Sequence, residues 1–68
     1  MDAAEFLATF ATAVGAKPLP PEQIETLLQL ASEAAHRSER LAAPIACYLV
    51  GRAGVDPAVA LEAARSIE

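Results

Sequence analysis

The sequence predicts an all-α fold, a small four-helix bundle-like domain, and three observations support this prediction. Alanine, the residue with the highest helix propensity, accounts for 17 of the 68 residues. Apolar residues recur three and four positions apart, whereas no stretch alternates apolar and polar residues as a half-buried strand does. Prolines and glycines separate four such apolar segments. We therefore expect one helical domain over residues 1–68, with short loops between its helices.

The first helix is predicted over residues 2–14. Asp2 suits the N-cap, and Glu5 three residues later completes the acidic form of a capping box. Gly15 follows, where a left-handed residue ends many helices. The expected inward face consists of apolar residues spaced three and four apart: Phe6, Leu7, Phe10, Ala13 and Val14. The next segment, AKPLPP, is expected to be a stiff connector, because each proline fixes its own φ and restricts the residue before it.

A second helix is predicted to begin at Pro21 and to end near residues 38–41. Proline is favoured in the first helical turn, and acidic residues follow it where the helix dipole favours them. His36, Arg37 and Arg40 lie toward the other end, where the dipole favours cations. The expected inward face is the apolar stripe of Ile24, Leu27, Leu28, Ala31, Ala34 and Ala35.

The third helix is predicted over residues 44–53 and at the centre of the domain. Pro44 would remove a hydrogen bond from a continuing helix, so a new helix is expected to begin there, although the second helix could instead only kink before it. The segment LAAPIACYLVG, residues 41–51, contains no charged side chain. Its apolar residues lie on nearly all sides of the helix: Ile45, Leu49 and Ala53 on one, and Ala46, Cys47 and Val50 on another. Such a helix must be covered from several sides, so we expect the other three to surround it.

The fourth helix is predicted to run from Asp56, as N-cap, to about Ile67. Pro57 then takes the first helical position, where its missing N–H is not needed. The expected inward face comprises Val59, Ala60, Ala63, Ala64 and Ile67.

Charge and length exclude several classes of protein. The net charge is −4, all of it within residues 1–35, which argues against a nucleic-acid binder because such a protein needs a basic face. The longest uncharged run has eleven residues, well short of the roughly 20 that cross a bilayer. The N-terminus carries acidic residues where a signal peptide has cationic ones. We therefore expect a cytoplasmic protein that contacts neither membrane nor nucleic acid.

The best candidate ligand site is the cationic end of the second helix, formed by His36, Arg37 and Arg40. Guanidinium groups pair with oxyanions in bidentate geometry, so these residues could bind a phosphate or carboxylate. The alternative is that they only complete the helix end, with Arg37 paired to Glu33 at i, i+4 spacing within the helix. Cys47 could be a nucleophile only beside a base, and the single histidine lies eleven residues upstream. We expect Cys47 to be a small buried apolar residue. No catalytic residue, metal site or cofactor is expected.

A chain this short builds only a thin core, because a domain of about 60 residues buries about 60% of its unfolded surface. One cysteine allows no intrachain disulfide to reinforce it. We therefore expect an interaction module, a homodimer or a protein with another partner. The expected interface residues lie on the third helix: Ile45, Tyr48 and Leu49. For Tyr48 the alternative is a core position with its hydroxyl at the surface.

The segment LLQLASEAAHRSERLAAPIACYLVGRAG, residues 27–54, resembles a family of short bacterial helical domains of unknown function. The residues that match the family pattern best are His36, Arg40 and Pro44, followed by an apolar helix that closes on two glycines. In that family the domain stands alone or is appended to proteins similar to molybdenum cofactor guanylyltransferases. The resemblance implies an accessory role near molybdenum cofactor metabolism and no activity of its own.

Overall fold

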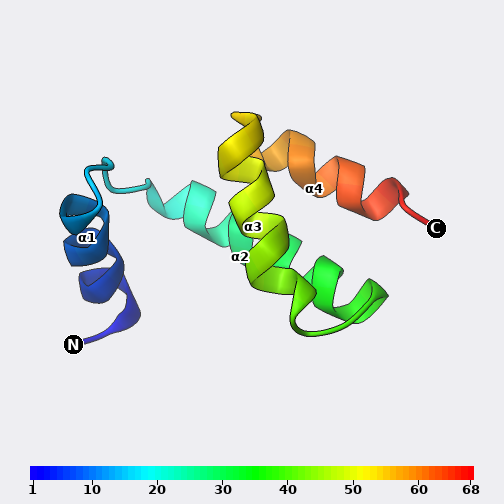
Figure 1. The fold of residues 1–68 in the computed structure, drawn as a ribbon, viewed down its shortest axis with the longest axis horizontal. Coiled ribbons are helices and arrows are strands. Elements are labelled where there is room, and N and C mark those ends of the chain that lie inside the picture. Colours follow the sequence, from blue (N-terminus) through cyan, green and yellow to red (C-terminus); the bar gives the residue numbers. More distant parts are fainter.

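The computed structural model describes all 68 residues, as four helices without any strand (Figure 1). Helices make up 74% of the chain, which confirms the all-α, four-helix prediction. The helices are α1 (Ala3–Ala13), α2 (Pro21–Arg37), α3 (Ala42–Ala53) and α4 (Pro57–Ser66).

The helix ends follow from local sequence. The Asp2 carboxylate accepts a hydrogen bond from the Glu5 N–H at 2.8 Å, and the Glu5 carboxylate accepts one from the Asp2 N–H at 3.3 Å. This is the predicted capping box at the start of α1. The Asp56 carboxylate likewise accepts from the Ala58 N–H at 2.8 Å at the start of α4. Gly54 ends α3 with a φ of 69°, in the left-handed region that glycine adopts without strain.

The start of α3 corrects the prediction that this helix begins at Pro44. The chain leaves α2 after Arg37, and α3 starts at Ala42, so α2 ends cleanly rather than kinking. The Ala42 N–H donates to the carbonyl of Glu39 at 2.9 Å, inside the turn that precedes the helix. Pro44 is the third residue of α3, and the first four N–H groups of a helix have no partner within it. Proline therefore fits the whole first turn and not only its first position.

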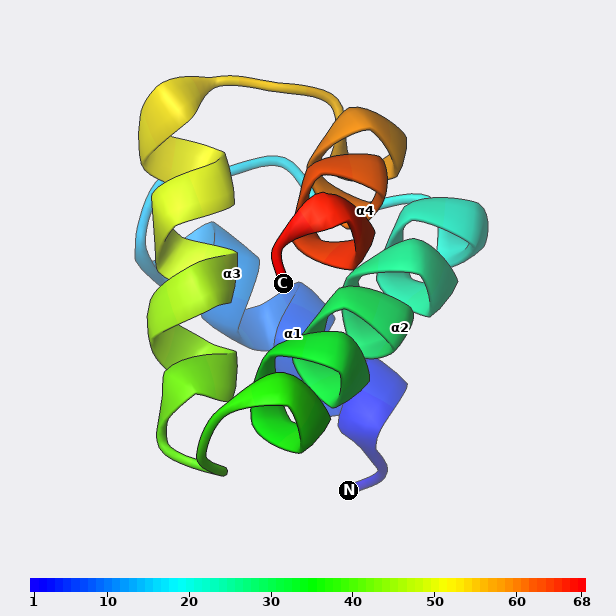
Figure 2. The same ribbon diagram turned by 90° about the vertical axis from the view of Figure 1, so that its right-hand side faces the viewer.

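The central helix is α2 and not α3. Both α3 and α4 pack on α2, which is the longest helix with 17 residues (Figures 1 and 2). Only two side chains of the chain are buried, Leu30 of α2 at 3% exposure and Leu61 of α4 at 7%. The expected inward faces included neither leucine. They included Leu28, Val59 and Ile67, all of which are exposed.

Helix α1 lies apart from the other three, at one end of the long axis (Figure 1). It has no buried residue, and the predicted inward face of Phe6, Leu7, Phe10, Ala13 and Val14 is exposed. Phe6 and Phe10 stack on each other within the helix, with ring centroids 5.9 Å apart. The proline-rich connector separates α1 from the other helices, and periodicity alone could not show what covers its apolar face.

The chain is extended for its size. Its extents are 36 × 23 × 19 Å and its radius of gyration is 12.3 Å, against about 11 Å for a compact chain of this length. Its accessible surface is 5257 Å², whereas a compact monomer of 7.1 kDa exposes about 4,100 Å². The chain therefore exposes about 1,200 Å² more surface than a compact monomer of this mass.

Candidate functional site

The outer face of α3 is apolar and exposed. The half-buried residues of this helix are on its inner side, and the Cys47 thiol there is 3.9 Å from the Leu27 carbonyl of α2. On the outer side, three large side chains of α3 and that of the residue before it, at i, i+4, i+7 and i+8 spacing, are each more than half exposed. We call them the α3 stripe: Leu41, Ile45, Tyr48 and Leu49. The structure thus brings the three predicted interface residues together at the surface and adds Leu41.

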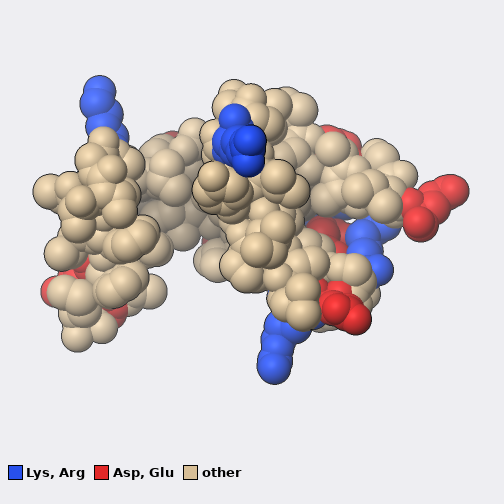
Figure 3. Space-filling view, viewed as in Figure 1, with Lys and Arg blue, Asp and Glu red and all other residues tan.

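A second exposed apolar face belongs to α1. Four large side chains of α1 and the residue after it, each about half exposed, form what we call the α1 stripe: Phe6, Leu7, Phe10 and Val14. Three of them line a groove of about 420 Å³ between α1, the connector and the start of α2, here called the α1 groove. Its only charged lining residue is Lys17, and its floor includes Leu19 and Ile24. Figure 3 shows α1 as a separate lobe, with a hollow between it and α3.

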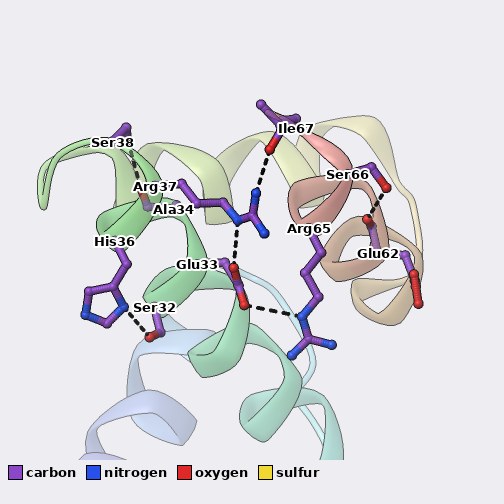
Figure 4. Close-up of polar contacts among 10 residues, drawn as sticks. All are labelled: Ser32, Glu33, Ala34, His36, Arg37, Ser38, Glu62, Arg65, Ser66 and Ile67. Atoms are coloured by element: carbon purple, nitrogen blue, oxygen red, sulfur yellow. Dashed lines mark hydrogen bonds and ion pairs between the residues drawn. The ribbon is translucent and has the colours of Figure 1, made fainter.

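The predicted anion-binding residues at the end of α2 point in different directions, and those that make contacts bind different partners. Arg37 Nε donates to Glu33 Oε1 at 2.8 Å, and its Nη1 donates to the Ile67 carbonyl beyond α4 (Figure 4). His36 points to another side of α2, where its Nδ1 is 3.1 Å from Ser32 Oγ. Arg40 lies in the turn after α2 and makes no ion pair. Anion binding by these residues stays a prediction.

The structure instead builds a charged junction around Glu33, which sequence reasoning placed only in a pair with Arg37. Arg65 Nε of α4 donates to Glu33 Oε2 at 3.3 Å, so the two carboxylate oxygens of Glu33 bind arginines from two helices (Figure 4). The hydrogen bond from Arg37, followed by that from Arg65, lowers the pKa of Glu33 below its ordinary value. The sequence spacing could not reveal Arg65, because it is 32 residues away.

Replacing Glu33 with glutamine is expected to lower stability near neutral pH and to have little effect in acid. A carboxyl whose pKa is lowered by folding contributes stability above its unfolded pKa, and this contribution disappears as the pH falls through the lower folded pKa. Denaturant unfolding of the wild type and of Glu33→Gln over a pH series measures the difference. Glu62→Gln on α4 removes the same charge from a residue without an ion pair. Identical pH profiles for the two variants would contradict a role for the junction.

Cys47 lies in an environment that disfavours the thiolate. Its side chain is half-buried on the inner side of α3, and this burial raises the pKa of the Cys47 thiol. A nucleophilic cysteine needs the opposite shift. No group of three or more histidine, cysteine, aspartate or glutamate side chains lies close enough together to hold a metal ion.

Comparison with known proteins places the whole chain in one family. A family model described as a domain of unknown function (DUF6457) matches residues 1–67. The match therefore includes all four helices and extends well beyond the resemblance seen over residues 27–54. No protein in the curated set and no solved structure matches the chain. None of the four helices has the length and apolar character needed to cross a membrane.

Proposed function

Because the chain belongs to the DUF6457 family, whose description assigns no function, we propose a function from its surfaces: it is a non-catalytic helical interaction module that works as a homodimer. The observation that carries this proposal is the imbalance between exposed and buried apolar residues. Fourteen large apolar side chains are exposed, whereas only two are buried. Exposed apolar patches, such as the α1 and α3 stripes among these residues, mark interaction sites.

The excess surface has the size that a stable dimer needs. If each chain hides its excess of about 1,200 Å² against a second copy, the dimer buries about 2,400 Å² in total. Obligate homodimers bury roughly 2,000–5,000 Å² and do so with apolar faces. The α1 and α3 stripes contain no charged side chain, as such an interface requires.

Sedimentation of the purified chain over a wide concentration range tests the homodimer. We expect a species of twice the 7.1 kDa chain mass that persists into the low micromolar range, of the order of 1 μM, because the interface is large and apolar. Far-UV circular dichroism of the same samples reports the helix content. A monomer with undiminished helix content at every concentration would contradict the proposal.

Binding of a small anion, such as a phosphate-bearing metabolite, at His36, Arg37 and Arg40 is a second proposal. It is favoured by Arg40, whose guanidinium group makes no ion pair. The anion would have to compete with Glu33 for Arg37. An NMR titration of the His36 ring with phosphate checks this, and unchanged His36 resonances would remove the proposal.

We further propose, on resemblance alone, an accessory role near molybdenum cofactor metabolism. The support is the likeness of residues 27–54 to domains appended to proteins similar to molybdenum cofactor guanylyltransferases. A binding measurement between the purified chain and such an enzyme tests it, and the absence of a detectable complex would contradict it.

A further inference from the structure

Each chain carries two apolar stripes that its own side chains leave uncovered. The α1 stripe borders the open α1 groove, and the α3 stripe faces away from α2. We propose that two copies pair reciprocally, so that the α3 stripe of each copy lies against the α1 stripe of the other and enters its α1 groove. This arrangement rests on the homodimer proposed above and specifies which surfaces meet.

The two stripes match in length and chemistry. Each covers eight residue steps, from Phe6 to Val14 and from Leu41 to Leu49, which is about 12 Å of helix. Each combines aromatic and aliphatic side chains, which pack well against each other. In a two-fold dimer this contact is made twice: the α1 stripe of the first copy meets the α3 stripe of the second, and the α3 stripe of the first meets the α1 stripe of the second. One association therefore covers all four stripes of the two copies.

The connector favours pairing between copies over closure within one chain. Pro18 and Pro20 fix φ at two of the positions that join α1 to α2, and Pro21 fixes it at the first residue of α2. Pro20 has an extended backbone with φ −66° and ψ 153°. These restraints limit how the connector can bend, and in the structure α1 lies apart from the other helices with the α1 groove open. A second copy can enter the groove without any change in the connector.

Charges at the helix ends favour an antiparallel arrangement of α1 and α3. Asp2 and Glu5 lie at the start of α1, and Lys17 follows its end. Arg52 is in the last turn of α3, four residues after Tyr48 of the stripe, and the Asp56 carboxylate beyond it caps α4. Glu39 and Arg40 before the start of α3 cancel each other. An antiparallel pairing brings the acidic start of α1 near Arg52, whereas a parallel one would bring Lys17 near Arg52. Phe10 and Ile45, at the centres of the stripes, meet in either orientation.

Disulfide cross-linking between the stripe centres tests the arrangement. In chains with Cys47→Ala, which removes the only native thiol, one preparation carries Phe10→Cys and the other Ile45→Cys. We expect oxidation of an equimolar mixture to convert about half of the protein to a covalent heterodimer, because random pairing makes about half of the two-fold dimers mixed and a disulfide forms only between Cβ atoms about 4 Å apart. Val59→Cys, on an equally exposed residue of α4 outside both stripes, replaces Ile45→Cys in the control and should give little product.

Three other results would overturn the reciprocal pairing. A chain with both Phe10→Cys and Ile45→Cys that closes an intrachain disulfide as a monomer would show that α1 folds onto its own α3. Self-linking of the Phe10→Cys chain or of the Ile45→Cys chain alone would show like stripes in contact. A dimer in sedimentation whose mixed chains stay unlinked would place the interface elsewhere. Sedimentation of the Cys47→Ala parent separates these results from failure of the homodimer itself, which appears as a monomer.

Discussion

Replacing Leu30 with alanine is expected to destabilise the fold by about 2–5 kcal/mol, the largest effect of any single truncation in this chain. Leu30 is the buried side chain of α2, the helix on which α3 and α4 pack, and it is only 3% exposed. A domain of 68 residues has a total stability of roughly 3–10 kcal/mol, so the variant should be largely unfolded or close to it. Urea denaturation followed by circular dichroism measures the change.

Leu28→Ala is the matched control for this experiment. It makes the same chemical change two residues away on the same helix, but Leu28 is 62% exposed. We expect a change within about 0.5 kcal/mol, because it removes little buried surface and alanine has high helix propensity. Equal losses of stability for the two variants would mean that the face of α2 around Leu30 is not buried. The comparison also tests the structure against the sequence pattern, which predicted Leu28 on the inward face and missed Leu30.

Ile45→Glu is expected to dissociate the homodimer while leaving each chain helical. Ile45 is in the middle of the α3 stripe, so a dimer would bury the new carboxylate without a partner. A loss of about 3 kcal/mol or more raises the dimer dissociation constant at least roughly 100-fold. The monomer should be little affected, because Ile45 is 58% exposed and faces away from α2. Sedimentation and circular dichroism, measured on the same samples, separate these effects.

Val59→Glu provides the control for Ile45→Glu. Val59 is 60% exposed on α4 and belongs to neither stripe, so the same change of charge should leave the dissociation constant within about threefold, or about 0.7 kcal/mol. If Ile45→Glu leaves the dimer intact, the α3 stripe is not part of its interface. Loss of helix content in Ile45→Glu would instead mean that this side chain supports the monomer fold.

Helix boundaries were largely predictable from sequence because the interactions that set them are local. Asp2 and Glu5 cap each other across three residues, and Asp56 with Pro57 starts α4 in the same local way. Pro44 was placed in the right turn but at the wrong position, because proline fits any of the first helical residues that lack an N–H partner. The apolar character of the α3 stripe could be read in the same way, from residues spaced one and two turns apart.

Only the parts of the candidate site that lie on a single helix could be predicted from the sequence. Ile45, Tyr48 and Leu49 share one helix, and the spacing already placed Ile45 and Leu49 on one side of it. Arg37 was linked to Glu33 by its i, i+4 spacing, but its contact with Ile67 and the approach of Arg65 depend on how α4 packs on α2. The α1 groove depends likewise on the path of the connector.

The sequence by itself determined four helices, most of their caps and the apolar residues on their surfaces. These features depend on propensity, hydrogen bonding and periodicity within a few residues of each other. Only the tertiary structure decided that α2 is central, that Leu30 rather than Leu28 is buried, and that α1 lies apart. Burial depends on which helix packs against which face. On α2 apolar residues recur three and four positions from Leu28 as well as from Leu30, so spacing alone does not specify that choice. For the same reason, the sequence shows that the α1 and α3 stripes are apolar but does not show that they are exposed in the folded chain.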